Sequence, residues 1–343
     1  MTFSKRPVKR TTEILLGHGS GGRLTHELIR DALLKKLDNP VLRELGDSAV
    51  IDYKERIAFT TDSFVVSPLF FPGGDIGKLA VTGTVNDLVM LGAVPEYISL
   101  ALIIEEGLRV SVLEKVIDSV ARSAKEARVR VVTGDTKVVE KLAADKLFIN
   151  TSGLGRVLGR RRLTLKNISP GDKIIVTGNI AEHGLSVLAK RKGPGLGLNI
   201  RSDCASLAGL IIPLLEKTRA IKFMRDPTRG GVATTLNEIA EGAGLGIEIE
   251  EKKLPLSDKV RAASELLGID PLYVANEGKA LLVVSRQEAE KVVGLLKLHP
   301  LGRRAAIIGA VTRREPGRVI SRTLFNTERV LDMLVSDPLP RIC

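Results

Sequence analysis

The stretch FPGGDIGKLAVTGTVNDLVMLGAVP, residues 71–95, sets a run of small and apolar residues between two glycine-containing breaks. FPGG predicts a turn, and the apolar run behind it predicts a helix from about Ile76 to Leu91. Asn86 and Asp87 lie inside this otherwise apolar helix. The usual explanation of a single acid in such a place is a cap or a half-buried ion pair. This pair alone therefore does not indicate a site.

Other segments also place polar residues where predicted strands end or helices begin. TTDSF puts Asp62 at the end of a strand, and TGDTK puts Asp135 beside Lys137 at the end of another. RDPTRGG puts Asp226 just before a helix, which Asp226 would cap in the simplest interpretation. Taken together with Asp87, these acids look like a divalent-cation cluster, because Mg²⁺ prefers a few carboxylates, water and substrate phosphates. The pattern predicts binding of a magnesium nucleotide.

A glycine-rich loop, GHGSGG (Gly17–Gly22), follows the strand-like TTEILL and precedes a helix predicted over about Leu24 to Leu37. The loop matches the dinucleotide fingerprint G-x-G-x-x-G, but the elements behind it do not alternate as a Rossmann domain requires. A tight turn is the plainer interpretation. A loop for phosphate also fits, since backbone N–H groups ahead of a helix favour anions.

The composition is that of a globular chain, with 44% hydrophobic and 27% charged residues among 343. The net charge of +12 suits nucleic acid, but aromatic residues make up 3% and tryptophan is absent, so bases would find few stacking partners. An acidic protein partner or a polyphosphate substrate suits the charge as well. We expect no membrane helix and no secretory signal, because no apolar run approaches about 18 residues and none follows MTFSKRPVKR. With two cysteines, the chain is expected in a reducing cytoplasm.

The order of predicted elements indicates two α+β halves joined near Leu158–Ile168. In the first half, RVSVLEKVIDSVARSAKEA predicts a long helix with Ser111 and Glu114 as its capping box. We expect a lead-in with the glycine loop and a helix, an N-terminal domain, a C-terminal domain and a mobile tail, at residues 1–40, 41–160, 161–335 and 336–343.

The chain closes with DPLPRIC, which ends in Cys343. This cysteine could be an accidental residue of a disordered tail. Prenylation would need the cysteine where Pro340 stands, and a disulfide with Cys204 does not suit a chain with so few cysteines. The remaining interpretation is chemical: a thiol on an extended arm carries a covalent group into an active site. YVANEGKALL places Glu277 in a turn before a strand, where it is either a solvent-facing residue or a general base.

Several motifs together resemble one known family: HGSGG, TTDSFVVSPLFFPGGDIGKLAVTGTVNDLVMLGA, VTGDTKVV, FINTSGLG, RDPTRGGVATTLNEIA, YVANEGK and the final PRIC. The chain resembles, over essentially its whole length, the HypE family of hydrogenase maturation proteins. These are carbamoyl dehydratases of the aminoimidazole-ribonucleotide-synthetase-like (PurM-like) ATP-binding superfamily. The PRIC ending is the most specific part, because other superfamily members lack it. The resemblance implies an α+β fold of two domains, with N-terminal strands forming a dimeric β-barrel, a C-terminal α/β sandwich and a flexible tail.

The resemblance also implies an activity. A carbamoyltransferase partner, HypF, would place a carbamoyl group on the terminal thiol, and the enzyme would use ATP to dehydrate this S-carboxamide to a thiocyanate. The cyano group would pass through a HypC–HypD iron scaffold to a [NiFe]-hydrogenase. Residues 41–160 would bind ATP and form a homodimer, and neither nucleic acid nor membrane would be a partner.

Roles for individual residues follow from the same resemblance. Cys343 would be the covalent carrier, Lys137 would steady charge at the reacting carbonyl, and Glu277 would take protons. Mg²⁺ and ATP would be held by Asp62, Asp87 and Asp226. Further nucleotide contacts would come from Gly19, Ser20, Gly21, Gly22, Asp47, Asn86, Asp135, Thr136, Thr228 and Gly230.

Two alternatives stay open on the sequence alone. A superfamily enzyme of the selenophosphate-synthetase or AIR-synthetase kind would use ATP to activate a free amide or selenide, without the tail. A basic nucleic-acid-binding protein would instead bind DNA or RNA with a steep dependence on salt. Replacement of Cys343 separates the first alternative from the leading hypothesis.

Overall fold

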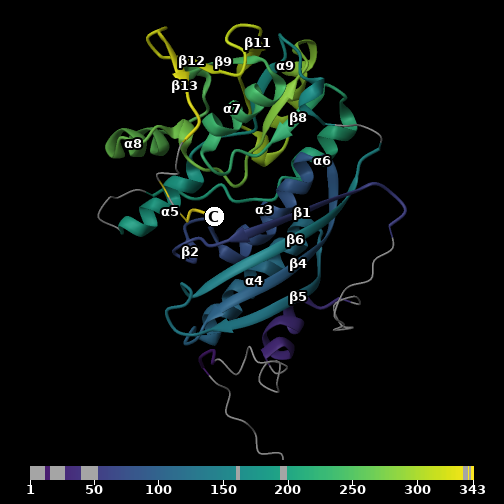
Figure 1. Ribbon diagram of the computed structural model, residues 1–343, viewed down its shortest axis with the longest axis vertical. Coiled ribbons are helices and arrows are strands. Elements are labelled where there is room, and N and C mark those ends of the chain that lie inside the picture. The colour runs from purple at the N-terminus through teal and green to yellow at the C-terminus, as the bar shows by residue number, and fades with distance from the viewer. Residues whose placement is uncertain are drawn as a thin grey trace, which may run out of the picture.

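The computed structural model describes residues 12–15, 28–39, 53–159, 163–193, 199–334, 339 and 341–343. The described chain forms two layered units of helices and sheet, one above the other in Figure 1, and the end of the chain lies between them. Within the described residues, no helix is both long and apolar enough to cross a membrane.

The first unit is built on a four-stranded sheet in the order β1-β6-β4-β5. Its strands are β1 (Ile57–Phe64), β4 (Ala93–Glu105), β5 (Arg130–Val139) and β6 (Leu147–Val157). β6 runs antiparallel to β1 and β4, whereas β5 runs parallel to β4 after a crossover through α4 (Val110–Ala127). Helices α3 (Ile76–Met90) and α4 cover one face of the sheet. A small hairpin of β2 (Phe70–Phe71) and β3 (Gly74–Asp75) precedes α3, and a π-helical turn (Ile29–Leu34) with α2 (Lys35–Leu37) lies against α4.

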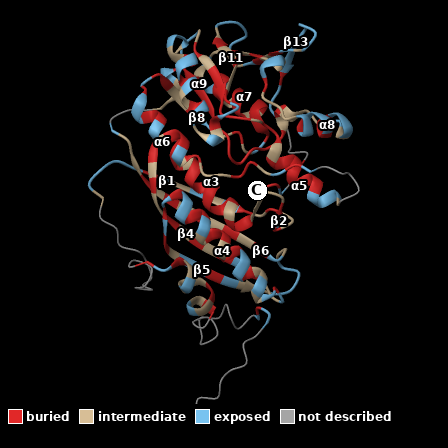
Figure 2. Ribbon diagram, turned by 180° about the vertical axis from the view of Figure 1, so that it is seen from behind, coloured by how far each residue is buried: buried red, intermediate tan, exposed pale blue. Residues whose placement is uncertain are grey.

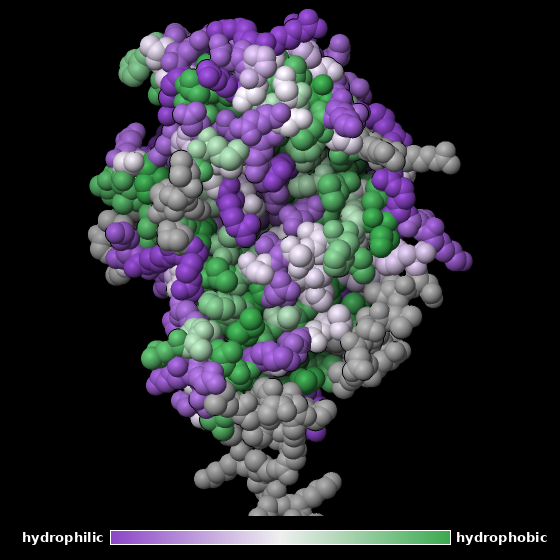
Figure 3. Space-filling view, in the orientation of Figure 1, coloured by the Kyte–Doolittle hydropathy of each residue, from purple (hydrophilic) through white to green (hydrophobic). Residues whose placement is uncertain are grey.

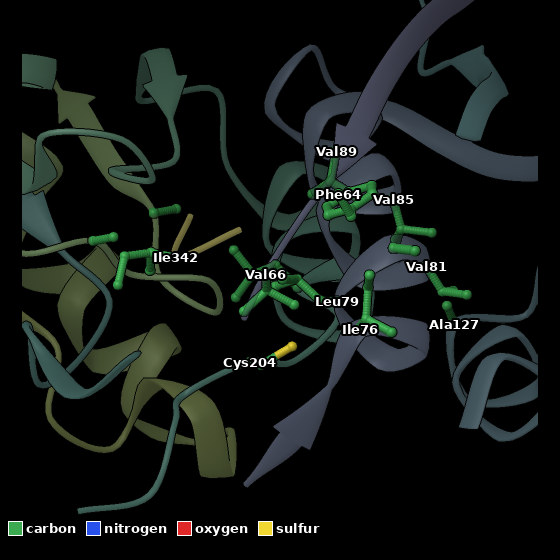
Figure 4. Close-up of a cluster of buried hydrophobic side chains, with 14 of the residues drawn as sticks. Phe64, Val66, Ile76, Leu79, Val81, Val85, Val89, Ala127, Cys204 and Ile342 are labelled. Atoms are coloured by element: carbon green, nitrogen blue, oxygen red, sulfur yellow. The ribbon is translucent and has the colours of Figure 1, made fainter. Parts of the chain in front are cut away.

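Helix α3 is buried on nearly all sides, which explains why its sequence lacks a polar stripe. The first sheet and α4 contact it on one side, and α6 (Ala208–Lys217) and β8 (Ile221–Arg225) of the second unit contact it on the other. Asp75 caps its first turn by accepting hydrogen bonds from the N–H groups of Gly77 and Lys78. The helix predicted for this segment is therefore confirmed. Figure 4 shows the buried cluster along it, from Phe64 of β1 to Ile76 and Val89.

The second unit contains a seven-stranded, mostly antiparallel sheet in the order β13-β12-β9-β11-β7-β10-β8. Its remaining strands are β7 (Lys173–Val176), β9 (Gly246–Glu250), β10 (Leu281–Val284), β11 (Ala306–Thr312), β12 (Val319–Arg322) and β13 (Glu328–Leu331). Both faces of the central strands are covered, so alternate residues enter two separate cores. Helices α6 and α9 (Ala289–Lys297) contribute to one core and α7 (Gly231–Ala243) to the other. Figure 2 shows the resulting buried interior of both units.

The other helices of the second unit lie at its sides. Helix α5 (Glu182–Lys192) faces the β2 hairpin of the first unit and contacts α8 (Asp258–Leu267). Short 3₁₀ turns occupy Leu165–Asn167, Glu251–Lys253, Pro271–Tyr273, Arg286–Glu288 and Pro300–Gly302. The two-domain α+β architecture expected for the AIR-synthase-like fold is present, and the strands among the described residues of one chain form open sheets.

One local prediction was wrong. Ser111 and Glu114 do not form a capping box, because α4 begins at Val110 and its N-cap residue is Arg109, whose side chain makes no capping hydrogen bond. The N–H of Val110 instead donates to the carbonyl of Thr12, at 2.9 Å. A distant segment thus satisfies a group at the helix start that a local cap would otherwise satisfy.

Asn86 connects the two units through its side-chain amide. Its Nδ2 donates to the carbonyls of Ala205 and Glu277, at 3.1 and 3.3 Å, and its Oδ1 accepts from the N–H of Leu207, at 2.8 Å. The side chain is 1% exposed, so water does not replace its bonds to Ala205 and Leu207, whereas the carbonyl of Glu277 also accepts from the N–H of Ala205, at 3.5 Å.

We expect Asn86→Ala to lower the free energy of unfolding by roughly 2–4 kcal/mol, because the carbonyl of Ala205 and the N–H of Leu207 lose the partner that Asn86 supplies. Urea unfolding followed by circular dichroism measures this. Asn179→Ala is the matched control, since it removes one bond to Glu182 at a half-buried position. Equal losses in the two variants would show that Asn86 is not an essential connection.

Candidate active site

A pocket lies where the two units meet. Its lining includes four acids, Asp62, Asp87, Asp226 and Glu277, and the terminal Cys343. Hydrophilic side chains gather across the middle of the face shown in Figure 3, at the junction of the units. Residues from β1, α3, the end of β8 and the loop before β10 thus converge, although more than 200 positions separate Asp62 from Glu277.

The acids from the first unit occupy adjacent elements. Asp87 lies near the end of α3, where the hydroxyl of Thr60 donates to its Oδ2 at 2.9 Å. Burial is the main cause that raises the pKa of Asp87 above its ordinary value. Asp62 on β1 accepts from the N–H of Ser63 at 2.8 Å and faces the guanidinium of Arg229 at 3.5 Å. Helix α3 packs against β1, so the two carboxyls come to one place.

Asp226 follows β8 and does not cap the next helix, since the N-cap of α7 is Gly230 in a left-handed conformation with φ of 68°. Burial, and then the nearby charge of Asp87, raise the pKa of Asp226 to about 7. A carboxyl held this way binds a proton in the absence of another cation near neutral pH.

Glu277 is not the solvent-facing residue of the plainer interpretation, since only 3% of it is exposed. Its backbone N–H donates to Asp203 at 3.1 Å, and Asp203 in turn pairs with the buried Lys279 at 3.2 Å. Its Oε1 has no hydrogen-bond partner among the described residues. Burial first, and then the charge of Asp226, hold the pKa of Glu277 well above its usual range. Such a group is ready to exchange a proton with a bound molecule.

The end of the chain reaches this pocket from between the units. An oxygen of the terminal carboxylate of Cys343 accepts from the N–H of Val65 at 3.1 Å, and Ile342 is 3% exposed. The sequence predicts a mobile tail, whereas the described end of the tail is packed in the structure. Movement of the tail remains a proposal.

The acids fit a magnesium ion only in part. Among the described residues, no three His, Cys, Asp or Glu side chains lie close enough to hold a metal by themselves. Mg²⁺, however, is usually bound by one or two carboxylates together with water and substrate phosphates. Asp62, Asp87 and Asp226 line one pocket, and their mutual repulsion contributes to the raised pKa of Asp87 and Asp226, so a cation there would relieve it.

Other expected site residues lie elsewhere within the chain. Lys137 and Asp135 form an exposed ion pair, at 2.9 Å, on the edge strand β5, and Thr136 between them is buried. This strand is at the opposite edge of the sheet from β1, so the three residues do not meet the pocket acids in one chain. The side chain of Asn86 is used by backbone groups and does not line the pocket.

Of the remaining residues predicted to contact the nucleotide, two lie within the described residues and the others do not. Thr228 lines the pocket, and Gly230 stands two residues later at the start of α7 without lining it. Gly19, Ser20, Gly21, Gly22 and Asp47 lie outside the described residues.

Arg229 is a pocket residue that the sequence analysis did not select. The charge of Cys343 is the main cause that raises the pKa of Arg229. The sequence offered one signal for this role, because Arg229 stands between Thr228 and Gly230 in RDPTRGG. A cationic side chain beside a predicted acidic cluster suits a phosphate or carboxylate ligand.

Comparisons with known proteins agree on one family. The model of the AIR synthase related protein N-terminal domain matches residues 45–157, and that of the C-terminal domain matches residues 169–322. A putative hydrogenase expression/formation protein of Methanocaldococcus jannaschii is 46% identical, over 95% of this chain and 98% of that protein. Carbamoyl dehydratase HypE of Escherichia coli is 44% identical, over 96% of this chain and 99% of that protein.

Solved structures give the same result. Hydrogenase maturation protein HypE in complex with ATP has a TM-score of 0.93 at 45% identity, covering 96% of this chain and 99% of that chain. A HypE–HypF complex has a TM-score of 0.79 at 46% identity, covering 91% of this chain and 100% of that chain. Thiamine monophosphate kinase of Aquifex aeolicus, at 21% identity and a TM-score of 0.59 over 88% of this chain and 98% of that chain, shares the fold.

We expect Glu277→Gln to be more stable than the wild type by an amount that grows with pH. Above the ordinary value of 4.5 the unfolded state releases the proton of this glutamate, whereas the folded state keeps it because its pKa is raised. The stability of the wild type therefore falls as pH rises towards the folded-state pKa, and the glutamine variant lacks this fall. Urea unfolding at several pH values measures the difference, with the exposed Glu241→Gln as control. Parallel curves for wild type and Glu277→Gln would contradict the assignment.

Proposed function

The chain belongs to the family of AIR synthase related proteins that includes the HypE carbamoyl dehydratases, and on this premise we propose that it dehydrates an S-carboxamide on its own Cys343 to an S-cyanide, with ATP and Mg²⁺. The observation that carries the proposal is the place of Cys343, which lines the same pocket as Asp62, Asp87, Asp226 and Glu277. A carrier at the end of the chain has to reach the site where its group reacts.

The reaction removes an oxygen that leaves poorly by itself. Transfer of the γ-phosphoryl group of ATP to the carboxamide oxygen converts that oxygen into part of a phosphate. Loss of both N–H protons and departure of phosphate then form the C≡N bond, so ATP and the carboxamide yield ADP, phosphate and the thiocyanate. Positioning and charge stabilisation supply most of the catalysis in such transfers.

The pocket acids support a division of roles. Mg²⁺ would supply charge neutralisation of the phosphates between Asp62, Asp87 and Asp226. Glu277 would take protons from the carboxamide nitrogen. Its pKa is raised in part by Asp226 and Asp62, so neutralisation of these acids by a cation would favour the basic, ionised form of Glu277. Arg229 would bind a phosphate or the terminal carboxylate.

The partners follow from the same family. A related HypE forms a complex with HypF, and we propose that a carbamoyltransferase of that kind loads Cys343 of this chain in a reducing cytoplasm. The cyano group would then pass to iron on a HypC–HypD scaffold. Full activity of a Cys343 variant on a free amide or selenide would instead favour the superfamily alternative.

A homodimer would complete the site. The face of the first sheet that α3 and α4 leave uncovered carries exposed Phe59 and Ile103, and β1 and β5 form its two edges. Within one chain, three strand spacings of about 4.8 Å separate Lys137 on β5 from β1. Pairing of β1 with β5 of a second copy would close a barrel and bring the second copy's Lys137 towards Asp62.

We expect Cys343→Ala to abolish the reaction and to leave nucleotide binding intact. Intact mass spectrometry after incubation with the carbamoyltransferase, carbamoyl phosphate and ATP should show, on the wild type, a carbamoyl adduct that loses one water. Cys204→Ser is the control, since Cys204 is buried and lies outside the pocket lining. An adduct that persists on the Cys343 variant would sink the proposal.

We expect Lys137→Ala and Glu277→Gln to be inactive separately and to regain activity when they are mixed under conditions that exchange subunits. Random exchange makes half of the dimers mixed, and one of the two sites in each is intact, so about a quarter of the wild-type activity should return. Mass spectrometry of the dehydrated product measures the recovery. No recovery from dimers shown to be mixed would place Lys137 in the same subunit as its Glu277.

A further inference from the structure

The last residues of the chain lie between the segment Val65–Ser67 and helix α5, which together form what we call the groove. Both sides of the groove donate hydrogen bonds to the tail. On one side is the segment that follows β1. The N–H of Val65 donates to the terminal carboxylate of Cys343 at 3.1 Å, and the N–H of Ser67 donates to the carbonyl of Arg341 at 3.3 Å. Alternate residues of two segments thus pair as at the edge of an antiparallel sheet. The tail is held here by its backbone.

On the other side, α5 of the second unit presents a fully buried histidine. His183 Nε2 lies 2.9 Å from the carbonyl oxygen of Ile342, and its Nδ1 lies 2.8 Å from Ser202 Oγ. A carbonyl oxygen can only accept, so Nε2 carries the proton and Nδ1 accepts from the serine hydroxyl. Burial lowers the pKa of His183, which agrees with this neutral form.

The histidine ring is fixed from several directions. Ser202 Oγ also accepts from the N–H of Cys204 at 3.0 Å, and the N–H of Ser202 donates to the carbonyl of Pro72 at 2.7 Å. Phe71 contacts the ring edge to face, with centroids 5.4 Å apart. A ring held so firmly presents its donor in one direction.

The same helix holds the tail a second time, eight residues later. Arg191 donates through Nη2 to the carbonyl of Arg341 and through Nε to the carbonyl of Ser67, at 2.5 Å for the latter. His183 and Arg191 stand about two helical turns apart, so both face the tail. The carbonyls of Arg341 and Ile342 and the terminal carboxylate of Cys343 therefore each accept a hydrogen bond from the groove.

The side chains of the tail add selectivity. Ile342 is 3% exposed and enters the cluster that contains Val66, as Figure 4 shows. Arg341 pairs with Asp145 at 2.9 Å and has a left-handed φ of 56°, a conformation that non-glycine residues adopt when contacts hold them. The groove thus recognises both the backbone and the two residues before the terminal cysteine.

We propose that this groove is a receptor for the last three residues of the chain and that His183 is its positioning residue, fixing Ile342 so that Cys343 points into the acidic pocket. The assignment deepens the proposed function and rests on it for the purpose of the docked thiol. If the tail shifted by one residue along the groove, the thiol of Cys343 would move by about 3.4 Å and its side chain would point to the opposite side. Reaction with a bound phosphoryl group does not tolerate such a displacement.

The test measures docking without any catalytic step. In a Cys204→Ser background, alkylation of Cys343 by iodoacetamide, followed by intact mass spectrometry, reports the fraction of time that the tail is undocked. His183→Ala should speed alkylation by roughly threefold to tenfold, because one buried hydrogen bond to the tail is lost. His183→Gln, whose amide can still donate to Ile342, should return most of the protection.

Ser186→Ala is the matched control, since this buried serine of the same helix bonds Pro72 and not the tail. It should leave the alkylation rate unchanged. If His183→Ala does not fold, Arg191→Ala at the exposed end of the helix should show the same acceleration. Unchanged alkylation in the folded His183 or Arg191 variant would overturn the receptor. If the His183 or Arg191 variant is alkylated faster but the wild type does not dehydrate the S-carboxamide, the groove is still a receptor and the proposed function is wrong.

Discussion

The junction of the two units and the pocket within it depend on helix α3, which packs against both units at once. Because the first sheet, α4 and the second unit all pack against α3, nearly every side chain on it must be small or apolar. Lys78, Asn86 and Asp87 are exceptions. Asn86 and Asp87 each have a role that depends on their buried position. Asn86 satisfies backbone groups of the second unit, and Asp87 carries a carboxyl into the pocket between the units.

The pocket places several carboxyl groups close together, which destabilises the protein when no cation is bound. Asp87, Asp226 and Glu277 all have raised pKa values, with burial as the first cause and neighbouring acids among the others. Selection for stability alone would remove such a cluster. Its presence is understandable if a cation and phosphates occupy the pocket, since the same charges then become favourable.

The chain end links this pocket to the covalent chemistry that we propose. Cys343 lies in one pocket with Asp62, Asp87, Asp226 and Glu277. Its suitability lies in reach: the tail brings a group that was attached elsewhere, and the groove formed by Val65, Ser67 and α5 sets where that group stops. Because both units contribute to the groove, their packing also sets the position of the thiol.

Several helices and strands, and the kinds of residue that line the pocket, could be predicted from the sequence. The FPGG turn and the apolar run behind it predicted α3, and acids at the ends of elements indicated a cation site, because both signals depend on near neighbours in the chain. Which of these residues meet depends on how the helices and sheets of the two units pack. This packing brought Arg229 to the acids, kept Lys137 at the far sheet edge, turned Asn86 to the backbone, and put His183 on the tail, 159 positions away in the chain. Such contacts join residues far apart in the chain, so no local pattern in the sequence indicates them.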